Sequence, residues 1–439
     1  MRMTSYWRFY LSLILLQIAV VISTSAQTAR TLIRTGHLLD VKTGAEPAAQ
    51  TIIITGDRIT AIAPTASTPK QSGDTEIDLT KYTVMPGLID VHTHLTFANN
   101  FDPYFELSMT PAKEGILGVE NAKVTLEAGF TTVRNVGAND FADVALRDEI
   151  NAGHIPGPHM QVSGPIIGIT GGHADDNLLP YEFHVHSEGV VDGIPAVQHQ
   201  VRENIKYGAD LIKIAATGGV LSKGDNPGAP QFTFEELKAA AETAHMAGRK
   251  IAAHAHGTEG IKNSILAGID SIEHASLIDD EGIRLAKEHG TYLVMDIYND
   301  DYILNEAPKF GLPTENIEKE KMVGKLQREN FEKAVKAGVK MAFGTDAGVY
   351  PHGDNAKQFY YMVKFGMTPA QAIRAATSSA ADLIGRASDV GTIEPGKYAD
   401  IIAVQSDPLS DIRSLEHVDF VMKGGTVYKD PRSGSATRQ

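Results

Sequence analysis

The chain contains no cysteine among its 439 residues, and this absence excludes several classes of site. Disulfide frameworks, thiolate metal ligands, cysteine nucleophiles and a lipidated N-terminal cysteine all require a thiol. Any bound metal ion must therefore be held by histidine, by carboxylates or by a ligand derived from lysine.

Basic residues are in the minority, with 40 Lys and Arg against 54 Asp and Glu and a formal net charge of −14. This balance argues against binding to nucleic acids or anionic membranes, because phosphate contacts depend on clustered basic side chains. Hydrophobic residues make up 42% of the chain and charged residues 21%, which permits a large core and excludes global disorder. At about 150 residues per domain, the length fits three average domains or one large barrel with a smaller companion.

Long apolar runs are absent after the first 26 residues. Within residues 1–26, Arg2 and Arg8 precede an apolar run at 9–22, and small residues follow up to Ala26, as in a secretory signal peptide. An uncleaved membrane anchor is the alternative, but the run is shorter than the about 20 residues that a bilayer span needs. We therefore expect cleavage near Ala26 and a periplasmic or secreted protein without a stable membrane anchor.

The remaining chain has β-rich ends and a central part in which short apolar segments alternate with Ala-rich helical patterns. Central strands are predicted at residues 87–91, 131–136, 160–166, 211–215, 251–255, 271–274, 292–295 and 340–343. Helices are predicted at 113–127, 141–150, 197–207, 234–246, 260–266, 280–288 and 318–336, with two more after the last strand.

This alternation predicts an α/β fold, a (β/α)8 TIM barrel over residues 86–390. The chain ends, 27–85 and 391–439, are too small for separate cores and are expected to pair as one discontinuous β-sandwich domain. In such a barrel, functional side chains lie at the C-terminal ends of the strands and in the loops that follow. The long loop at 168–196 is typical of a lid or a binding loop.

The first barrel strand ends in two histidines, in the sequence Met-Pro-Gly-Leu-Ile-Asp-Val-His-Thr-His at 85–94. Because residues two apart share one face of a strand, His92 and His94 point the same way and can chelate a metal ion. Structural hydrogen bonding is the alternative for this pair. His184 and His186 have the same spacing, but no strand precedes them, and we predict a solvated loop there.

A lysine, Lys213, interrupts the apolar strand at 211–215. Burial of an ammonium group is costly unless the group is paired or chemically altered. Lys213 is therefore either a lysine that reaches the surface or a desolvated amine that has captured carbon dioxide. The resulting carbamate has two oxygens that can bridge two cations.

Three further histidines and one aspartate follow predicted strands. His254 and His274 end successive strands and are predicted to be metal ligands rather than structural core histidines. His256 shares a face with His254 one step further out, which fits either a substrate contact or support of a metal ligand. Asp346, in Gly-Thr-Asp-Ala-Gly at 344–348, is predicted to act in metal binding and proton transfer rather than as a helix cap.

These motifs together resemble the amidohydrolase superfamily. The resemblance rests on residues 86–94, Lys213, His254, His274 and 344–348, and on Gly-Thr-Ile-Glu-Pro-Gly-Lys-Tyr-Ala-Asp at 391–400. Within the superfamily the chain is most similar to the imidazolonepropionase-like branch, which includes exported Xaa-Pro dipeptidases, carboxypeptidases acting on C-terminal Arg or Lys, and ochratoxin-type amidases. The segments 170–175 and 346–355 fit this branch.

The resemblance implies a centre of two zinc ions, or of another divalent metal. One ion would be held by His92, His94 and Asp346, the other by His254 and His274, with N6-carboxylated Lys213 as the bridge. A water shared by the ions would lose a proton at neutral pH, and the resulting hydroxide would attack an amide carbonyl. Asp346 would carry the proton to the leaving nitrogen, and His173 would stabilise the oxyanion, position the substrate or be a simple loop histidine.

Two features distinguish the chain within the superfamily. Many close relatives carry Tyr where this chain has His256. Mononuclear deaminases and imidazolonepropionases usually place an acidic or amide-bearing group just after the histidine of the fifth strand. Here Ala255, His256 and Gly257 follow His254, and Lys213 is present, both of which disfavour the mononuclear branches.

The expected function is therefore that of an exported binuclear zinc amidohydrolase that cleaves an amide or peptide bond next to a free carboxylate. Candidate substrates are Xaa-Pro or other dipeptides, N-acyl amino acids and ochratoxin-type aryl amides. The alternatives are a mononuclear cyclic-amide hydrolase or deaminase, and a non-catalytic binding protein. Tyr298, Tyr302, Tyr350 and His352 are candidates for an aromatic substrate pocket or for packing of the barrel rim, and the resemblance implies a homo-oligomer.

Overall fold

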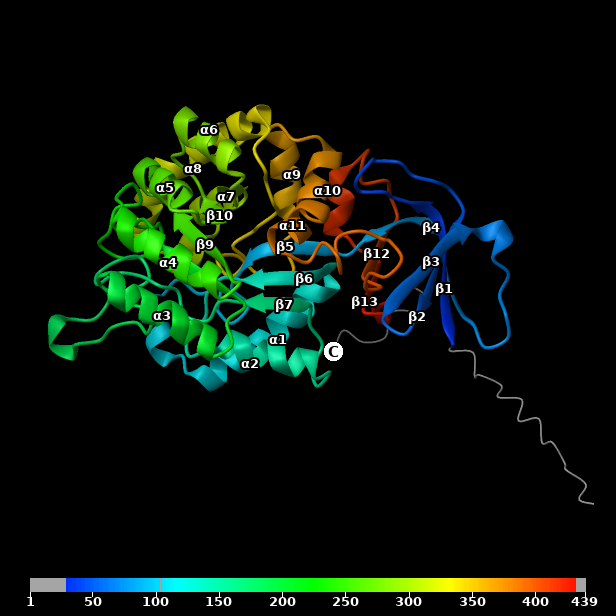
Figure 1. The fold of residues 1–439 in the computed structure, drawn as a ribbon, viewed down its shortest axis with the longest axis horizontal. Coiled ribbons are helices and arrows are strands. Elements are labelled where there is room, and N and C mark those ends of the chain that lie inside the picture. Colours follow the sequence, from blue (N-terminus) through cyan, green and yellow to red (C-terminus); the bar gives the residue numbers. More distant parts are fainter. Residues whose placement is uncertain (1–28, 103, 432–439) are drawn as a thin grey trace, which may run out of the picture.

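The computed structural model of the protein describes residues 29–102 and 104–431. Figure 1 shows a β-sheet at one end of the molecule and, beside it, parallel strands that helices surround. The predicted signal peptide at 1–26 lies outside the described residues. Within the described ranges, no helix combines the length and apolarity that a membrane crossing requires.

Both ends of the chain contribute to one seven-stranded sheet, in the order β14-β13-β12-β4-β1-β2-β3. In β12, Ile402 lies opposite Met85 of β4, so the C-terminal strands extend the N-terminal sheet directly. Buried apolar side chains such as Ile52 and Phe420 form a core of their own against this sheet. The strands are β1 (Arg30–Leu38), β2 (Gln50–Thr55), β3 (Arg58–Pro64), β4 (Thr75–Pro86), β12 (Ile401–Val404), β13 (Phe420–Lys423) and β14 (Thr426–Lys429).

The expected pairing of the two chain ends is thus present in the described strands. They make one continuous sheet because the long strand β4 pairs with β1 on one side and with β12 on the other. One strand thereby joins the strands of both chain ends.

The central part of the chain contains two parallel sheets, β5-β6-β7 and β8-β9-β10-β11. Every residue of β5 and β8 is buried, as expected for parallel strands with both faces covered. The strands are β5 (Leu88–Thr93), β6 (Phe130–Asn135), β7 (His159–Val162), β8 (Leu211–Ala215), β9 (Lys250–Ala255), β10 (Ser271–His274) and β11 (Tyr292–Val294).

Helices connect and cover these strands (Figure 1). The helix α4 shows why the sequence predicts them well, because Thr233 and Glu236 form a reciprocal capping box at its start. The helices are α1 (Pro111–Glu127), α2 (Ala142–Asn151), α3 (Ile194–Lys206), α4 (Phe234–Met246), α5 (Thr258–Leu266), α6 (Asp280–His289), α7 (Asn299–Asn305), α8 (Thr314–Ala337), α9 (Lys357–Lys364), α10 (Pro369–Ala375) and α11 (Ser378–Leu383). Short 3-10 helices lie at Thr65–Ser67, Glu106–Ser108, Tyr181–Phe183, Ala307–Phe310 and Ile412–Glu416.

Two predicted strands differ from the structure. The strand expected at 160–166 ends at Val162, because Gly164 has a positive φ of 64° and Pro165 has no amide hydrogen to donate. The strand expected at 340–343 forms only an isolated bridge from Met341 to Leu293. Its backbone hydrogen bonds are divided between two neighbours, with Ala342 N donating to Leu293 O and Phe343 O accepting from Val91 N, so that neither ladder is long.

Isolated parallel bridges also connect the two parallel sheets to neighbouring segments. Ile167 pairs with Ile214 of β8, and Ala347 pairs with Thr93 of β5. The segment after β11 contains α7, where the sequence predicts only a loop, and three helices rather than two follow residue 343. The consequence for the site is that the ends of β5, β8, β9 and β10 and the residues around 346 meet in one region.

Candidate metal centre

The six predicted metal ligands come together at the C-terminal ends of the parallel strands. Each of these six residues is at most 9% exposed, so their side chains are shielded from water. His92 lies on β5 and His94 just after it, Lys213 on β8, His254 on β9, His274 at the end of β10, and Asp346 after the bridge at Met341.

The carboxylate of Asp346 lies between the two histidines of the first barrel strand. Its Oδ1 atom is 3.3 Å from Nε2 of His92 and 3.3 Å from Nε2 of His94. Candidate ligand atoms of His92, His274 and Asp346 all lie within 4.8 Å of one another. These distances allow one ion to be shared by groups from three separate segments of the chain.

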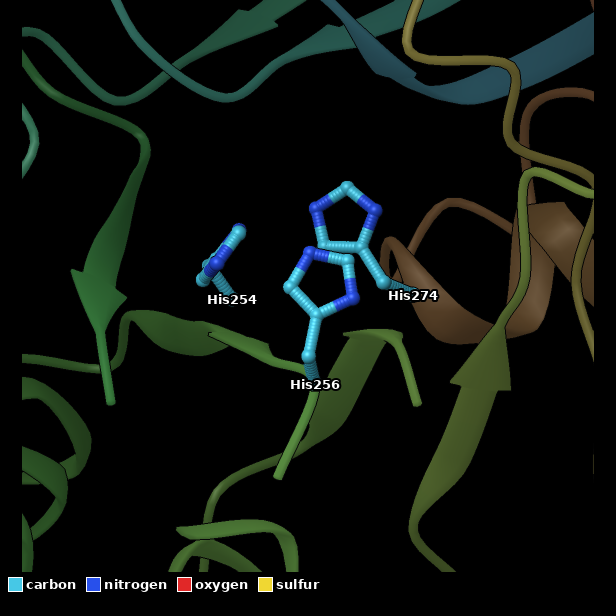
Figure 2. A group of neighbouring side chains, drawn as sticks. All are labelled: His254, His256 and His274. Carbon is cyan, nitrogen blue, oxygen red and sulfur yellow. The ribbon is translucent and has the colours of Figure 1, made fainter. Parts of the chain in front are cut away.

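A second group consists of His254, His256 and His274, whose candidate ligand atoms also lie within 4.8 Å of one another. Figure 2 shows their three imidazole rings side by side. The rings of His254 and His274 are 4.5 Å apart at their centroids, and those of His256 and His274 are 4.7 Å apart and stacked. Because His274 belongs to both groups, the two groups form one continuous cluster.

His256 is closer to the ligands than its predicted place one step further out indicates. Its Nδ1 atom is 2.7 Å from Oγ of Ser276, and its ring is 4.8 Å from that of His254. The hydroxyl of Ser276 holds the ring orientation and leaves Nε2 of His256 available to a ligand. A role in metal binding or in substrate contact is therefore compatible with this position.

Lys213 is 2% exposed. Its amine interacts electrostatically with His92 of the first group and with His254 of the second. Burial lowers the pKa of Lys213 to about 8, although Glu273 and Asp346 oppose this shift. A larger fraction of the amine is therefore neutral at physiological pH than for an ordinary lysine, and only the neutral amine reacts with carbon dioxide. Capture of carbon dioxide would replace a buried cation by an anion suited to metal ions.

Two histidines of the cluster, His254 and His256, have the neutral state that metal ligands need. Burial lowers the pKa of His254 and His256 well below the ordinary value, so both rings are neutral and carry a free lone pair. His274 and Asp346 have positive φ angles of 67° and 57°, which is strained for residues other than glycine and typical of functional sites. Neutral imidazoles and a carboxylate buried together fit a divalent cation better than they fit one another.

Two carboxylates that sequence reasoning missed orient the histidine rings. Oε2 of Glu273 lies 3.0 Å from Nδ1 of His92, and Oδ1 of Asp296 lies 2.9 Å from Nδ1 of His274. Each contact uses Nδ1–H and leaves Nε2 of the ring for a metal ion, as second partners of metal-bound histidines do. Glu273 directly precedes His274 in the buried strand β10, and a charged residue in such a strand is a signal from which its role could have been predicted.

Glu273 is balanced by a buried arginine, Arg134, on β6. Nη2 of Arg134 is 2.7 Å from Oε1 of Glu273, and Oγ of Ser271 donates to the same oxygen at 2.6 Å. Burial alone would raise the pKa of Glu273, but the charge of Arg134 and the hydrogen bond to His92 outweigh it and hold the pKa far below the ordinary value. Glu273 is therefore an ionised acceptor for His92.

Removal of this arginine should destabilise the protein strongly. We expect Arg134→Met to lower the free energy of unfolding by about 3 to 5 kcal/mol, because Glu273 would remain buried without its cation. Urea denaturation followed by circular dichroism measures the change. The matched control is Arg284→Met, since Arg284 pairs with Glu288 on an exposed helix face and should change stability by less than about 1 kcal/mol. Equal effects of the two variants would contradict the role of the buried pair.

An asparagine on the unpredicted helix α7 also reaches the centre. Nδ2 of Asn299 donates to Oδ2 of Asp296 at 2.7 Å and to Oδ2 of Asp346 at 3.2 Å. Asn299 thus fixes one carboxylate oxygen of Asp346 while the other faces His92 and His94. The signal for this residue was weak, because the sequence predicts only a loop in this segment.

The residues predicted to contact the substrate have different surroundings. The ring of His173 stacks on that of His254 with centroids 4.1 Å apart, so it borders the centre, as His256 does. Tyr350 is fully buried and packs against Tyr298 and Tyr302 in an apolar cluster, which places it in the packing of the rim.

His352 contacts the backbone of His94 rather than its imidazole ring. Its Nε2 atom donates to the backbone oxygen of His94 at 3.2 Å, and its Nδ1 atom is 3.4 Å from Oγ1 of Thr125. This contact supports the backbone of a predicted ligand. His184 and His186, predicted to be solvated, are exposed.

The Amidohydrolase family model matches residues 83–428 of the chain. The ochratoxinase of Aspergillus niger is 34% identical, over 94% of this chain and 90% of its own length. The crystal structure of that enzyme has a TM-score of 0.81 at 31% identity, with 92% and 96% of the two chains covered. The crystal structure of a Xaa-Pro dipeptidase with methionine bound in the active site has a TM-score of 0.86 at 40% identity and covers 91% of this chain and all of the other.

These similarities cover both the sheet of the chain ends and the parallel strands that carry the histidine cluster. The identities exceed 30% over nearly the whole chain, so that more than the fold is shared. The protein therefore belongs to the amidohydrolase family and is a hydrolase that acts on carbon–nitrogen bonds.

Proposed function

We propose that the chain is an exported binuclear amidohydrolase that cleaves an amide or peptide bond next to a free carboxylate. The observation that carries this proposal is the burial of Lys213 among His92, His94, His254, His274 and Asp346 at the ends of the parallel strands. A deaminase or a simple binding protein has no evident use for a buried lysine there. Similarity to an ochratoxinase and to a Xaa-Pro dipeptidase, both named for amide substrates, supports the same reading.

In this proposal two zinc ions, or other divalent ions, occupy the cluster. His92, His94 and Asp346 would hold one ion, His254 and His274 the other, and carboxylated Lys213 would lie between them. The ions would supply Lewis acidity, which polarises the scissile carbonyl and makes water acidic enough to attack at neutral pH. His256 is close enough to contact either the second ion or the substrate.

The protein's own groups would manage the proton. Asp346 would accept a proton from the attacking water and give it to the leaving nitrogen, because an amine is a poor leaving group until it is protonated. The hydrogen bond from Asn299 to Oδ2 keeps the carboxylate of Asp346 from rotating during this transfer. Glu273 and Asp296 would keep the rings of His92 and His274 in place throughout.

The architecture proposed for this function is a closed eight-stranded barrel, in which residues 340–347 take the place of the eighth strand. The hydrogen bonds of Phe343 and Ala347 to Val91 and His94 support this arrangement. Export, with cleavage near Ala26, and assembly into a homo-oligomer belong to the same proposal. N-terminal sequencing and light scattering of the secreted protein test these two points.

Metal analysis combined with a hydrolysis screen tests the function. We expect about two divalent ions per chain, loss of activity on dialysis against a chelator, and recovery on addition of zinc. The screen should include Xaa-Pro and Xaa-Arg dipeptides, N-acyl amino acids and an aryl amide of phenylalanine. One ion per chain with release of ammonia would instead favour the mononuclear alternative, and inactivity on the whole panel with bound metal would favour a binding protein.

A further inference from the structure

The long helix α8 buries several polar side chains on the face that packs against the rest of the protein. Its buried residues include the amides of Asn316, Gln327 and Asn330. A helix that covers a core normally buries an apolar stripe, and a buried polar group is stable only where it is hydrogen-bonded. Two of these amides, Gln327 and Asn330, have their hydrogen-bond partners in or beside the segment that carries His274.

Gln327 is linked to both the backbone and the ring of His274. Its Nε2 atom donates to the backbone oxygen of His274 at 3.2 Å and to Oδ1 of Asp296 at 3.0 Å. The same oxygen of Asp296 lies 2.9 Å from Nδ1 of the His274 ring. Both hydrogens of the amide are thus used, one on the backbone of His274 and one on the carboxylate that orients its ring.

The backbone at this point is strained. His274 and Ala275 are successive residues with positive φ angles of 67° and 50°, a conformation that residues other than glycine rarely adopt. The carbonyl groups on either side of Ala275 both accept from α8, since Gln327 donates to His274 and Nδ2 of Asn330 donates to Ser276 at 2.9 Å. Strained residues persist only where their surroundings hold them, and these two amides hold both carbonyl groups of the turn.

The conformation of this turn determines where the ring of His274 lies. His274 belongs to both groups of candidate ligand atoms, and its ring lies beside those of His254 and His256 (Figure 2). Gln327 and Asp296 are each 4% exposed, so water does not readily replace a lost hydrogen bond between them. Loss of the Gln327 amide should therefore be felt at the ring of His274 and in both groups.

We infer that Gln327, together with Asn330, is a positioning residue that holds the backbone of His274 in its strained conformation and keeps its ring directed into the cluster. Gln327 acts through His274 and Asp296 and not by contact with reacting atoms. The inference rests on the proposed function only for the presence of the metal ions. The support of the turn is a property of the folded chain itself.

A crystal structure of the metal-free Gln327→Met variant tests the positioning without metal or substrate. Methionine is similar in size to glutamine and lacks the amide group. We expect the φ angle of His274 to move toward negative values, or Nδ1 of its ring to move out of hydrogen-bond distance of Asp296. An unchanged backbone together with an unchanged contact to Asp296 would overturn the inference.

Removal of zinc from the loaded protein by a chelating dye measures the consequence for the metal centre. We expect Gln327→Met to weaken the binding of at least one zinc ion by about tenfold or more, a usual effect of losing a group that supports a metal ligand. Gln327→Asn provides a second variant with a polar side chain. It should weaken zinc binding in the same direction, because the amide is one methylene shorter and cannot reach both acceptors.

The matched control is Asn316→Leu, because Asn316 is a buried amide on the same face of α8 and donates to the backbone oxygen of Val220 at 2.6 Å. This variant loses the same type of hydrogen bond where no predicted ligand is involved. Its resistance to urea should fall, whereas its zinc affinity should equal that of the wild type. Wild-type zinc affinity in Gln327→Met, or an equal loss of affinity in Asn316→Leu, would overturn the inference.

These outcomes are distinct from a failure of the proposed function. If the wild type binds zinc but hydrolyses nothing in the screen, the proposed function fails and both tests of Gln327 still apply. If the wild type binds no zinc, the proposed function fails, and the conformation of His274 in Gln327→Met alone decides the inference.

Discussion

Replacement of Lys213 by alanine is expected to lower kcat/KM by about a thousandfold or more, which corresponds to at least about 4 kcal/mol of transition-state stabilisation. The physical reason is that Lys213 is the only group of the cluster that can become an anion with two oxygens between the two histidine groups. Without it, five neutral or singly charged ligands would have to hold two dications. Steady-state kinetics and metal analysis of the variant measure the effect.

The same variant allows chemical rescue. Short carboxylic acids such as acetate or propionate should partly restore both activity and the second metal ion, since a free carboxylate can occupy the space of the lost carbamate. The matched control is Lys250→Ala on the neighbouring strand β9, because the side chain of Lys250 is 44% exposed and pairs with Asp270. Full activity of Lys213→Ala would end the bridging role of Lys213.

Replacement of Asp346 by asparagine should separate metal binding from turnover. We expect the variant to retain part of its metal and to lose about a thousandfold in kcat, a typical effect of removing a general acid–base group. The amide cannot carry a proton between the attacking water and the leaving nitrogen, whereas its oxygen still reaches His92 and His94. Measurement of kcat together with metal stoichiometry checks this prediction.

The control for that experiment is Asp280→Asn, since the side chain of Asp280 is 90% exposed at the start of α6. Near-normal rates in Asp346→Asn would remove the proton-transfer role. Complete loss of metal in this variant would leave ligation as its sole demonstrated role.

Local patterns in the sequence predict much of this molecule. The strands at 211–215 and 271–274 and the helix at 234–246 have the predicted bounds, because apolar runs, helical periodicity and the capping box at Thr233 are properties of neighbouring residues. The predicted metal ligands follow from the same local patterns. A polar residue at the end of a buried strand is rarely needed for packing and therefore indicates a functional role. Parallel strands bring their C-terminal ends together, so such residues meet in one site.

The groups that support the ligands depend on contacts that no local pattern encodes. Arg134 and Glu273 are 139 residues apart in the chain, and both are buried charges whose partner is visible only in the folded protein. Asn299 lies on a short helix that the sequence predicts as loop, and its amide group connects the nearby Asp296 with Asp346 from a distant segment.

The sequence by itself determined the α/β class, the pairing of the two chain ends and the residues of the candidate metal centre, since these depend on hydrophobic periodicity and on which residue types can bind a metal ion. Only the tertiary structure decided that the chain ends form one sheet through β4 and that Glu273 and Asp296 orient the histidines. Burial and hydrogen bonding between distant segments set ring orientation and protonation, and both exist only once the chain has folded.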